Sequence, residues 1–301
     1  MREVAAIVVT YNRKELLYKN ITSLLSQTKD ESDIFIIDNA STDGTYEYIK
    51  HFIDNKKVFY INTGKNQGGA GGFTFGIKNA VLAGYEYIWL MDDDTIPLSN
   101  ALEQLLQADH LLDGSYGFLS SAVMWTDGTA CLMNIPQIKQ PWYKELELLK
   151  DGLLLCKQAS FVSLFIKSEV IYTVGLPIKE FFIWADDFEY TQRIAQKYDC
   201  YIVGKSQVIH EMKFNNTSNI ALDDITRIDR YKYAYRNEFY IARNNGFRAF
   251  LHQILRIAKH FIQVLIYSKK YRLKRGWIII SSSFRGLFFN PEIQFLKKEK
   301  Q

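Results

Sequence analysis

Three consecutive carboxylates, Asp92, Asp93 and Asp94, follow directly after the apolar residues 87–91. Like charges this close together are costly unless a divalent cation or a sugar hydroxyl interacts with them. If the backbone here is extended, the side chains of Asp92 and Asp94 point to the same side. This pattern predicts a site for a metal ion and a nucleotide sugar. The alternative is an acidic turn that caps a helix beginning near Pro97.

A second acidic cluster lies in the segment FIWADDFEY, residues 182–190, where Asp186, Asp187 and Glu189 follow aromatic side chains. A carboxylate beside aromatic rings has its pKa raised toward neutrality, which suits a general base, and aromatic faces pack well against sugar rings. Helix capping by Asp186 or Asp187 is the alternative. His210 ends the apolar segment 201–209, and a histidine at that position is either structural or a third metal ligand.

Four glycines fall within five residues at positions 68, 69, 71 and 72, after Asn66 and directly before an expected helix. Glycine allows the backbone to approach a ligand closely, and a helix N-terminus offers amide donors to an anion. The spacing matches neither the P-loop nor the dinucleotide-binding fingerprint. The segment is therefore predicted to bind a phosphate-containing ligand, with a flexible turn as the alternative.

Alternating strand and helix patterns position these residues in the first hundred positions. Strands are predicted at residues 4–10, 33–38, 58–62 and 85–91, and helices at 14–27, after the capping residues 41–44, and at 73–82. Such alternation predicts an α/β fold with a mostly parallel sheet flanked by helices. Ligands gather at the carboxyl edge of parallel strands, so the polar residues after each strand should line one crevice: Thr10, Tyr11, Asn12, Arg13, Asp38, Asn66, Asp92, Asp93 and Asp94.

The rest of the chain is mixed in pattern. We expect helices at 102–112 and 187–197, strands at 116–124, 159–166 and 201–209, and a weakly patterned stretch at 126–156. From residue 225 onward the chain is helical in character. Residues 1–220 are predicted to form one domain, with halves 1–100 and 101–220, and residues 221–301 a helical, basic, amphipathic C-terminal region.

The net charge of +4 conceals a strong asymmetry, because residues 246–301 hold twelve Lys or Arg and two Glu. That region carries +10 and the remainder −6, which favours an anionic partner surface. Apolar residues at helical spacing between 247 and 265 indicate a helix that either packs on the core or lies on an anionic membrane. No nucleic-acid-binding module is recognised. Scattered cysteines, with no signal peptide or membrane-spanning run, predict a cytoplasmic protein at the inner face of the membrane.

Taken in order, the segments VVTYNR, IIDNASTDGT, NQGGAGGF, WLMDDD, FIWADDFEY and the final IH resemble family 2 of the inverting glycosyltransferases, which have the GT-A fold. The resemblance covers roughly residues 3–212 and is most like the bacterial galactofuranosyltransferases. It implies an α/β GT-A catalytic domain at 1–220, with a nucleotide-sugar half at 1–100 and an acceptor half at 101–220.

The resemblance also implies roles for individual residues. Thr10, Tyr11, Asn12 and Arg13 would border the nucleotide, Asp38 the uracil, and Asn66, Gly68 and Gly69 the ribose and diphosphate. Asp92, Asp94 and His210 would hold Mn²⁺ or Mg²⁺, while Asp93 would face the donor sugar. Asp187 would be the general base, and Trp184, Asp186 and Glu189 would contact the acceptor.

The implied function is a metal-dependent inverting transfer of a sugar, expected to be galactofuranose from UDP-galactofuranose, to a glycan or polyprenyl-diphosphate-linked acceptor. Two alternatives remain open. One is a dTDP-rhamnose-dependent rhamnosyltransferase, and the other is a non-catalytic protein that binds sugar nucleotides. The sequence also leaves open whether the chain forms a homo-oligomer.

Overall fold

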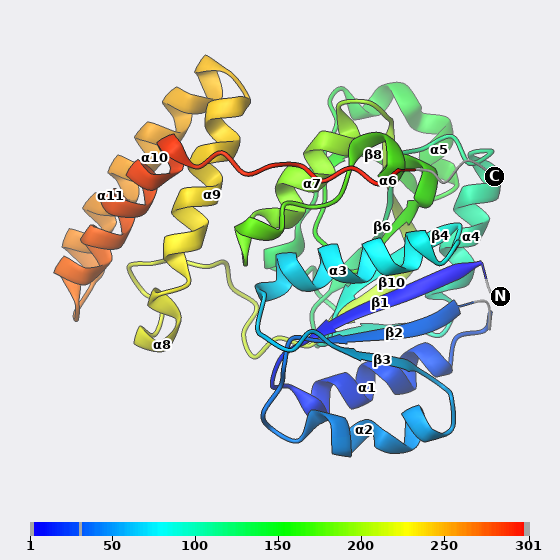
Figure 1. Ribbon diagram of the computed structural model, residues 1–301. Helices are drawn as coiled ribbons and strands as arrows, with labels where there is room; N and C mark the ends of the chain where they lie inside the picture. Colours follow the sequence, from blue (N-terminus) through cyan, green and yellow to red (C-terminus); the bar gives the residue numbers. More distant parts are fainter. Residues whose placement is uncertain (1–2, 30–31, 298–301) are drawn as a thin grey trace.

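The computed structural model describes residues 3–29 and 32–297 of the chain, and a mixed ten-stranded sheet forms its centre (Figure 1). The strands run in the order β3-β2-β1-β4-β9-β6-β10-β8-β7, and β5 pairs with β10 beside this path. The strand bounds are β1 Val4–Thr10, β2 Ser32–Asp38, β3 Phe59–Asn62, β4 Tyr87–Asp92, β5 Thr95–Pro97, β6 Leu119–Met124, β7 Gln137–Ile138, β8 Leu153–Gln158, β9 Leu164–Lys167 and β10 Cys200–His210.

Helices cover both faces of the sheet and extend beyond it at the C-terminal end (Figure 1). The α-helices are α1 Lys14–Leu25, α2 Thr45–Asp54, α3 Gly68–Leu82, α4 Ala101–Leu111, α5 Leu146–Lys150, α6 Ser168–Val174, α7 Asp186–Ala195, α8 Ile225–Ile228, α9 Tyr231–Asn244, α10 Phe247–Tyr267 and α11 Arg272–Phe288. Three short 3₁₀ helices span Leu132–Asn134, Trp142–Glu145 and Lys179–Phe181.

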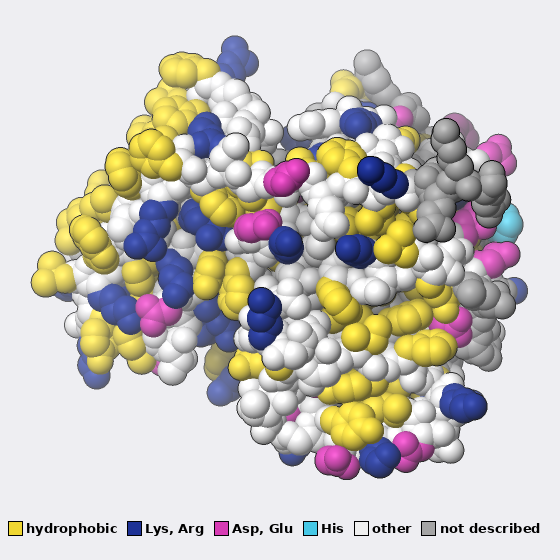
Figure 2. Space-filling model, in the orientation of Figure 1, with side chains coloured by type: hydrophobic (Ala, Val, Ile, Leu, Met, Phe, Trp, Pro, Cys, Tyr) yellow, Lys and Arg dark blue, Asp and Glu magenta, His cyan; other side chains and the backbone are white. Residues whose placement is uncertain are grey.

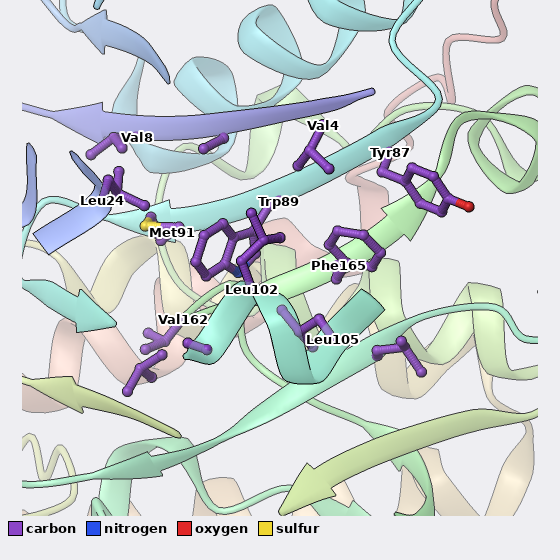
Figure 3. Packing of buried hydrophobic residues seen from close by; sticks show 14 of the residues in the cluster. Val4, Val8, Leu24, Tyr87, Trp89, Met91, Leu102, Leu105, Val162 and Phe165 are labelled. Carbon is purple, nitrogen blue, oxygen red and sulfur yellow. The ribbon is translucent and has the colours of Figure 1, made fainter. Parts of the chain in front are cut away.

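The strands of the N-terminal half are parallel, as the sequence predicts. β1 pairs in parallel with β2 and β4, and β2 pairs in parallel with β3. Alternate residues of β1 face opposite sides, so Ala6 and Val8 pack toward α1, α2 and α4, whereas Ile7 and Val9 pack toward α3. Figure 3 shows the first of these cores, in which Trp89 lies among apolar side chains from α4 and β9. These two buried layers fix the carboxyl edge of the sheet.

Two predicted elements differ from the structure. The strand expected at 159–166 is instead the start of β9 at Leu164, and β8 before it ends at Gln158. The helix expected at 73–82 begins at Gly68, so the glycine cluster lies within α3 and not before it. Packing explains this, because a Cβ at Gly72 would lie 2.6 Å from Cγ1 of Val9, and glycine lets the helix approach β1. This close approach outweighs glycine's low helix propensity.

Helices α8 to α11 lie outside the sheet and share a separate apolar cluster that includes Tyr231, Tyr235, Val264 and Ile279. Beyond α11, the chain returns to the catalytic part, where the backbone N–H of Leu176 donates to the carbonyl of Gln294 at 2.8 Å (Figure 1). Among the residues that the structure describes, no helix combines the length and apolarity needed to cross a bilayer.

Candidate active site

The carboxyl ends of neighbouring strands bring the predicted polar residues to one edge of the sheet. Thr10 is in register with Asp38 on β2, and Val9 is in register with Asp92 on β4. β10 adds His210, which pairs with Thr95 directly after the triple carboxylate. Residues that are about 200 positions apart in sequence therefore meet here because β10 and β5 are antiparallel partners.

Asp92, Asp94 and His210 form a compact group whose ligand atoms all lie within 4.8 Å of one another. Nε2 of His210 lies 3.1 Å from Oδ1 of Asp94, and Nδ1 of His210 lies 2.7 Å from Oδ1 of Asn134. With Nδ1–H donating to Asn134, the Nε2 lone pair is free to bind a metal ion. Two carboxylates and one imidazole fit a divalent cation such as Mn²⁺ or Mg²⁺.

The pKa values in this group are strongly perturbed. Burial, and then the charge of Asp94, raise the pKa of Asp92 to about 6. Burial opposes protonation of His210, but the hydrogen bond and charge of Asp94 outweigh it and raise the pKa of His210 to about 10. The group therefore holds excess negative charge that a cation can neutralise.

Arg13 and Thr10 contact the other side of the triple carboxylate. Oγ1 of Thr10 donates to Oδ2 of Asp93 at 2.7 Å, and Nη1 of Arg13 lies 3.3 Å from Oδ1 of Asp93. Arg13 also forms an ion pair with Asp94. Burial raises the pKa of Asp93 to about 7 despite the opposing charge of Arg13. Sequence reasoning assigned Arg13 to the nucleotide; here it partly neutralises the acidic cluster.

Asp38 and Asn12 organise the loop after β1 and do not line the main cavity. Oδ1 of Asp38 accepts the backbone N–H of Ser41 at 2.8 Å, and Oδ2 accepts the hydroxyl of Tyr60 at 2.5 Å. Asn12 has a positive φ of 55°, and its Oδ1 accepts the backbone N–H of Thr42 at 2.7 Å. Tyr11, by contrast, is exposed and lines the cavity.

Asn66 and the first residues of α3 form the opposite wall of the cavity. Oδ1 of Asn66 accepts the backbone N–H of Gly68 at 2.8 Å, so this donor already has a partner. A Cβ at Gly69 would meet no atom within 4 Å, whereas a Cβ at Gly68 would lie 2.0 Å from the carbonyl oxygen of Phe182. The open space predicted for the whole glycine cluster is therefore confined to Gly69 among the cavity-lining glycines.

Asp186 and Asp187 begin α7 directly after a backbone segment in an unusual conformation. Phe182, Trp184 and Ala185 all have positive φ, between 65° and 67°. Burial, and then the charge of Asp186, raise the pKa of Asp187 well above its usual range. Burial raises the pKa of Asp186 to about 7. Both carboxyls line the same cavity as the triple carboxylate, and a raised pKa suits a group that takes up a proton.

The three predicted acceptor residues have different surroundings. The Trp184 ring meets Tyr231 edge-on, with ring centroids 4.8 Å apart, and both line the cavity. Asp186 also lines it, but Glu189 does not, because its two carboxylate oxygens accept from Nε and Nη2 of Arg193, each at 2.8 Å. Glu189 is thus not brought together with the other predicted site residues.

The cavity has a volume of about 1660 Å³ and extends from the triple carboxylate to α9 and α10. Its wall includes residues that sequence reasoning missed: Asn134, Arg227, Arg230, Tyr231, Tyr235, Glu238, Arg256 and His260. Asn134 lies in a weakly patterned stretch that gives no signal of its role beside His210. The cationic residues of 227–256 were a signal, but the sequence linked the charge of the C-terminal region to a membrane and not to a cavity wall.

Comparison with known proteins identifies the family. Residues 5–114 match the model of glycosyl transferase family 2. Galactofuranosyltransferase GlfT1 of Mycolicibacterium smegmatis is 27% identical over 210 residues, which are 64% of this chain and 65% of that protein. The protein of the same name from Mycobacterium tuberculosis H37Rv is 33% identical over 94 residues, or 30% of each chain. The matches thus span less than two thirds of either relative, and they confirm the family predicted from the motifs.

A solved structure supports the fold. Mannosyltransferase PcManGT from Pyrobaculum calidifontis, in complex with GDP-Man and Mn²⁺, superposes with a TM-score of 0.58 at 17% identity, covering 95% of this chain and 87% of that one. The chain therefore has the GT-A fold that its sequence predicts.

Proposed function

We propose that this chain, with its glycosyl transferase family 2 domain, transfers galactofuranose from UDP-galactofuranose to a lipid-linked glycan with inversion at the anomeric carbon. One observation carries the proposal: a single cavity holds both a cation-binding group, Asp92, Asp94 and His210, and a carboxyl of raised pKa, Asp187. Inverting transfer needs these two features, one for the leaving diphosphate and one for the acceptor hydroxyl.

In the proposed reaction the acceptor hydroxyl gives its proton to Asp187 as its oxygen attacks the anomeric carbon. The bond from that carbon to the UDP oxygen breaks, and the leaving diphosphate takes the electron pair. A bound divalent ion would supply Lewis-acid stabilisation of the diphosphate. Asp92, Asp94 and His210 would hold that ion, and Asn134 keeps the His210 ring in the required orientation. A single displacement converts an α-linked donor into a β-linked product.

The choice of donor sugar is supported by the two galactofuranosyltransferase relatives and by the cavity wall at Gly69. Galactofuranose carries an exocyclic diol that needs space beside the ring, and Gly69 leaves such space. Asp93, which also lines the cavity, offers a hydrogen-bond acceptor for the hydroxyls of the sugar. Rhamnose ends in a methyl group and would leave such an acceptor unpaired.

The acceptor is proposed to enter along the arm of the cavity that reaches α9 and α10. Trp184, Tyr231 and Tyr235 line this arm, and aromatic side chains with polar tips suit carbohydrate rings. Arg227 and Arg230 lie on the same wall and suit the diphosphate of a polyprenyl-linked acceptor.

We further propose that the outer face of α10 and α11 lies on an anionic membrane. Hydrophobic side chains cover the outer edge of this helix pair, with Lys and Arg side chains next to them (Figure 2). Leu273 is 90% exposed and Trp277 is 70% exposed. An exposed apolar face beside cationic side chains is typical of helices that bind at a bilayer surface. A second copy of the chain is the competing occupant.

A donor screen monitored by nucleotide release tests the catalytic proposal. We expect UDP release from UDP-galactofuranose, in the presence of Mn²⁺ and a lipid-linked glycan, clearly above that from UDP-galactopyranose or dTDP-rhamnose. Turnover of dTDP-rhamnose with none of UDP-galactofuranose would contradict the donor assignment. Binding of UDP without turnover of any donor would favour a sugar-nucleotide binding protein.

Co-sedimentation with vesicles tests the membrane proposal. The full chain should bind phosphatidylglycerol vesicles and release at high salt, and Trp277→Glu should weaken binding more than the control Leu82→Glu, an exposed leucine on α3. Equal binding of the two variants would contradict the proposal. A dimer that Trp277→Glu dissociates would assign the face to a second copy.

A further inference from the structure

The backbone that leads into Asp187 requires external support. Left-handed φ values at Phe182, Trp184 and Ala185 are unfavourable for residues with a Cβ, and such conformations persist only when the surroundings impose them. Asp186 and Asp187 follow immediately as the first residues of α7. The direction in which Asp187 enters the cavity therefore depends on whatever holds residues 182–185 in place.

One buried side chain on α9 supplies that support. Nδ2 of Asn237 lies 3.0 Å from the carbonyl oxygen of Phe181, 2.9 Å from that of Trp184 and 3.3 Å from that of Ile183. Asn237 is fully buried, so no water replaces these bonds if the amide is removed. Carbonyl oxygens only accept hydrogen bonds, so the position requires an N–H donor.

Arg236 fixes the orientation of the Asn237 amide. Its Nε and Nη2 donate to Oδ1 of Asn237 at 3.0 and 2.9 Å, which leaves the two N–H groups of the amide directed at residues 181–184. Nη2 of Arg236 also donates to the carbonyl of Glu180 at 2.6 Å. Together, two consecutive residues of α9 bond four consecutive acidic-loop positions except Phe182.

The remaining carbonyl is held from the opposite side. The backbone N–H of Ala70, in the first turn of α3, donates to the carbonyl of Phe182 at 3.1 Å. The Phe182 ring stacks on Tyr233 of α9, with centroids 4.7 Å apart. The segment is thus fixed between the helix that borders the nucleotide side of the cavity and a helix of the C-terminal region.

We propose that Asn237 is a positioning residue for the transfer reaction, because it holds the strained segment 182–185 that directs Asp187 at the acceptor hydroxyl. This inference rests on the proposed function. Asn237 touches neither the carboxylates that would bind the metal ion nor the nucleotide side, so its loss should affect the chemical step and not UDP binding. A displacement of about 1 Å at a reacting group costs roughly a hundredfold in rate.

The test compares Asn237→Ala with Asn244→Ala, an exposed asparagine on the same helix. Turnover of UDP-galactofuranose with acceptor gives kcat and KM, and calorimetry with UDP and Mn²⁺ gives the affinity and the number of binding-competent molecules. We expect kcat of Asn237→Ala to fall roughly a hundredfold, with UDP affinity and stoichiometry unchanged, and Asn244→Ala to behave as wild type.

Two outcomes would overturn the inference. One is a kcat within threefold of wild type, and the other is a loss of UDP stoichiometry in proportion to the loss of kcat, which is the result of a purely structural role. If Asn237→Ala does not fold, Arg236→Lys decides, since it keeps the charge but loses the paired bonds to Oδ1; it should lower kcat alone. Asp187→Asn is measured in parallel: its full activity would contradict the proposed mechanism itself and not the role of Asn237.

Discussion

Replacing Gly68 by alanine should displace the backbone beside Asp187. Gly68 has a φ of 72°, which a residue with a Cβ rarely adopts, and the added Cβ would lie 2.0 Å from the carbonyl oxygen of Phe182. Because the obstructing atom belongs to the backbone, no rotamer change relieves the contact. The segment 182–185 must move, and the hydrogen bond from Ala70 to Phe182 must lengthen or break. Gly69→Ala is the matched control, because its Cβ meets no atom within 4 Å.

The size of the effect follows from these contacts. A left-handed backbone costs an alanine roughly 1–2 kcal/mol, and the lost hydrogen bond costs about 1 kcal/mol, so the free energy of unfolding should fall by roughly 2–3 kcal/mol. The entropy of unfolding for a chain of this length is roughly 0.6 kcal/mol/K, so Tm should fall by about 4 °C. Gly69→Ala should raise Tm slightly, since alanine favours a helix by about 1 kcal/mol.

Thermal unfolding followed by circular dichroism gives both Tm values, and UDP release gives kcat. We expect kcat of Gly68→Ala to fall roughly ten- to a hundredfold, because the moved segment carries Asp187. A Gly68→Ala protein with the Tm and kcat of wild type would refute the view that α3 and residues 182–185 are in tight contact. A larger loss of stability in Gly69→Ala than in Gly68→Ala would refute it equally.

Three further changes address the site directly. Asp187→Asn should reduce turnover to less than about a tenth of wild type, because it removes a base, while UDP affinity measured by calorimetry stays unchanged. His210→Ala should weaken Mn²⁺ binding and lower activity, with partial recovery at high Mn²⁺; full activity in EDTA would exclude the metal assignment. Asp186→Asn removes a like charge that raises the pKa of Asp187, so the pKa of Asp187 should fall and the acid limb of the kcat/KM profile should move to lower pH. An unmoved acid limb would show that another group titrates.

The N-terminal half of the fold could be predicted closely from sequence, because buried parallel strands are continuous apolar runs. The strand predicted at 4–10 has the same bounds in the structure, and the meeting of Asp94 with His210 follows from both residues ending strands. The helical start at Gly68 could not be predicted, since glycine propensity argues against it and only contact with Val9 reverses the preference.

The residues that support the site were harder to predict for a related reason. Asn134 and Asn237 act through single hydrogen bonds to partners 76 and 53 to 56 positions away, and a lone asparagine carries no periodic signal. The pairing of Glu189 with Arg193 at i, i+4 on α7, in contrast, was visible in the sequence but was set aside for a role in acceptor binding.

The return of the chain after α11 ties the helical region to the catalytic part at both ends. Phe289 packs on the rings of Phe181 and Tyr240, and Gln294 bonds Leu176. A helix pair attached at two points acts as a rigid mount and not as a tether. If α10 and α11 rest on a bilayer, the cavity is held at a fixed height and tilt above the lipid surface. The enzyme would then select acceptors by how far their reactive hydroxyl stands from the membrane, so the length of the glycan already built would itself decide which molecules are extended.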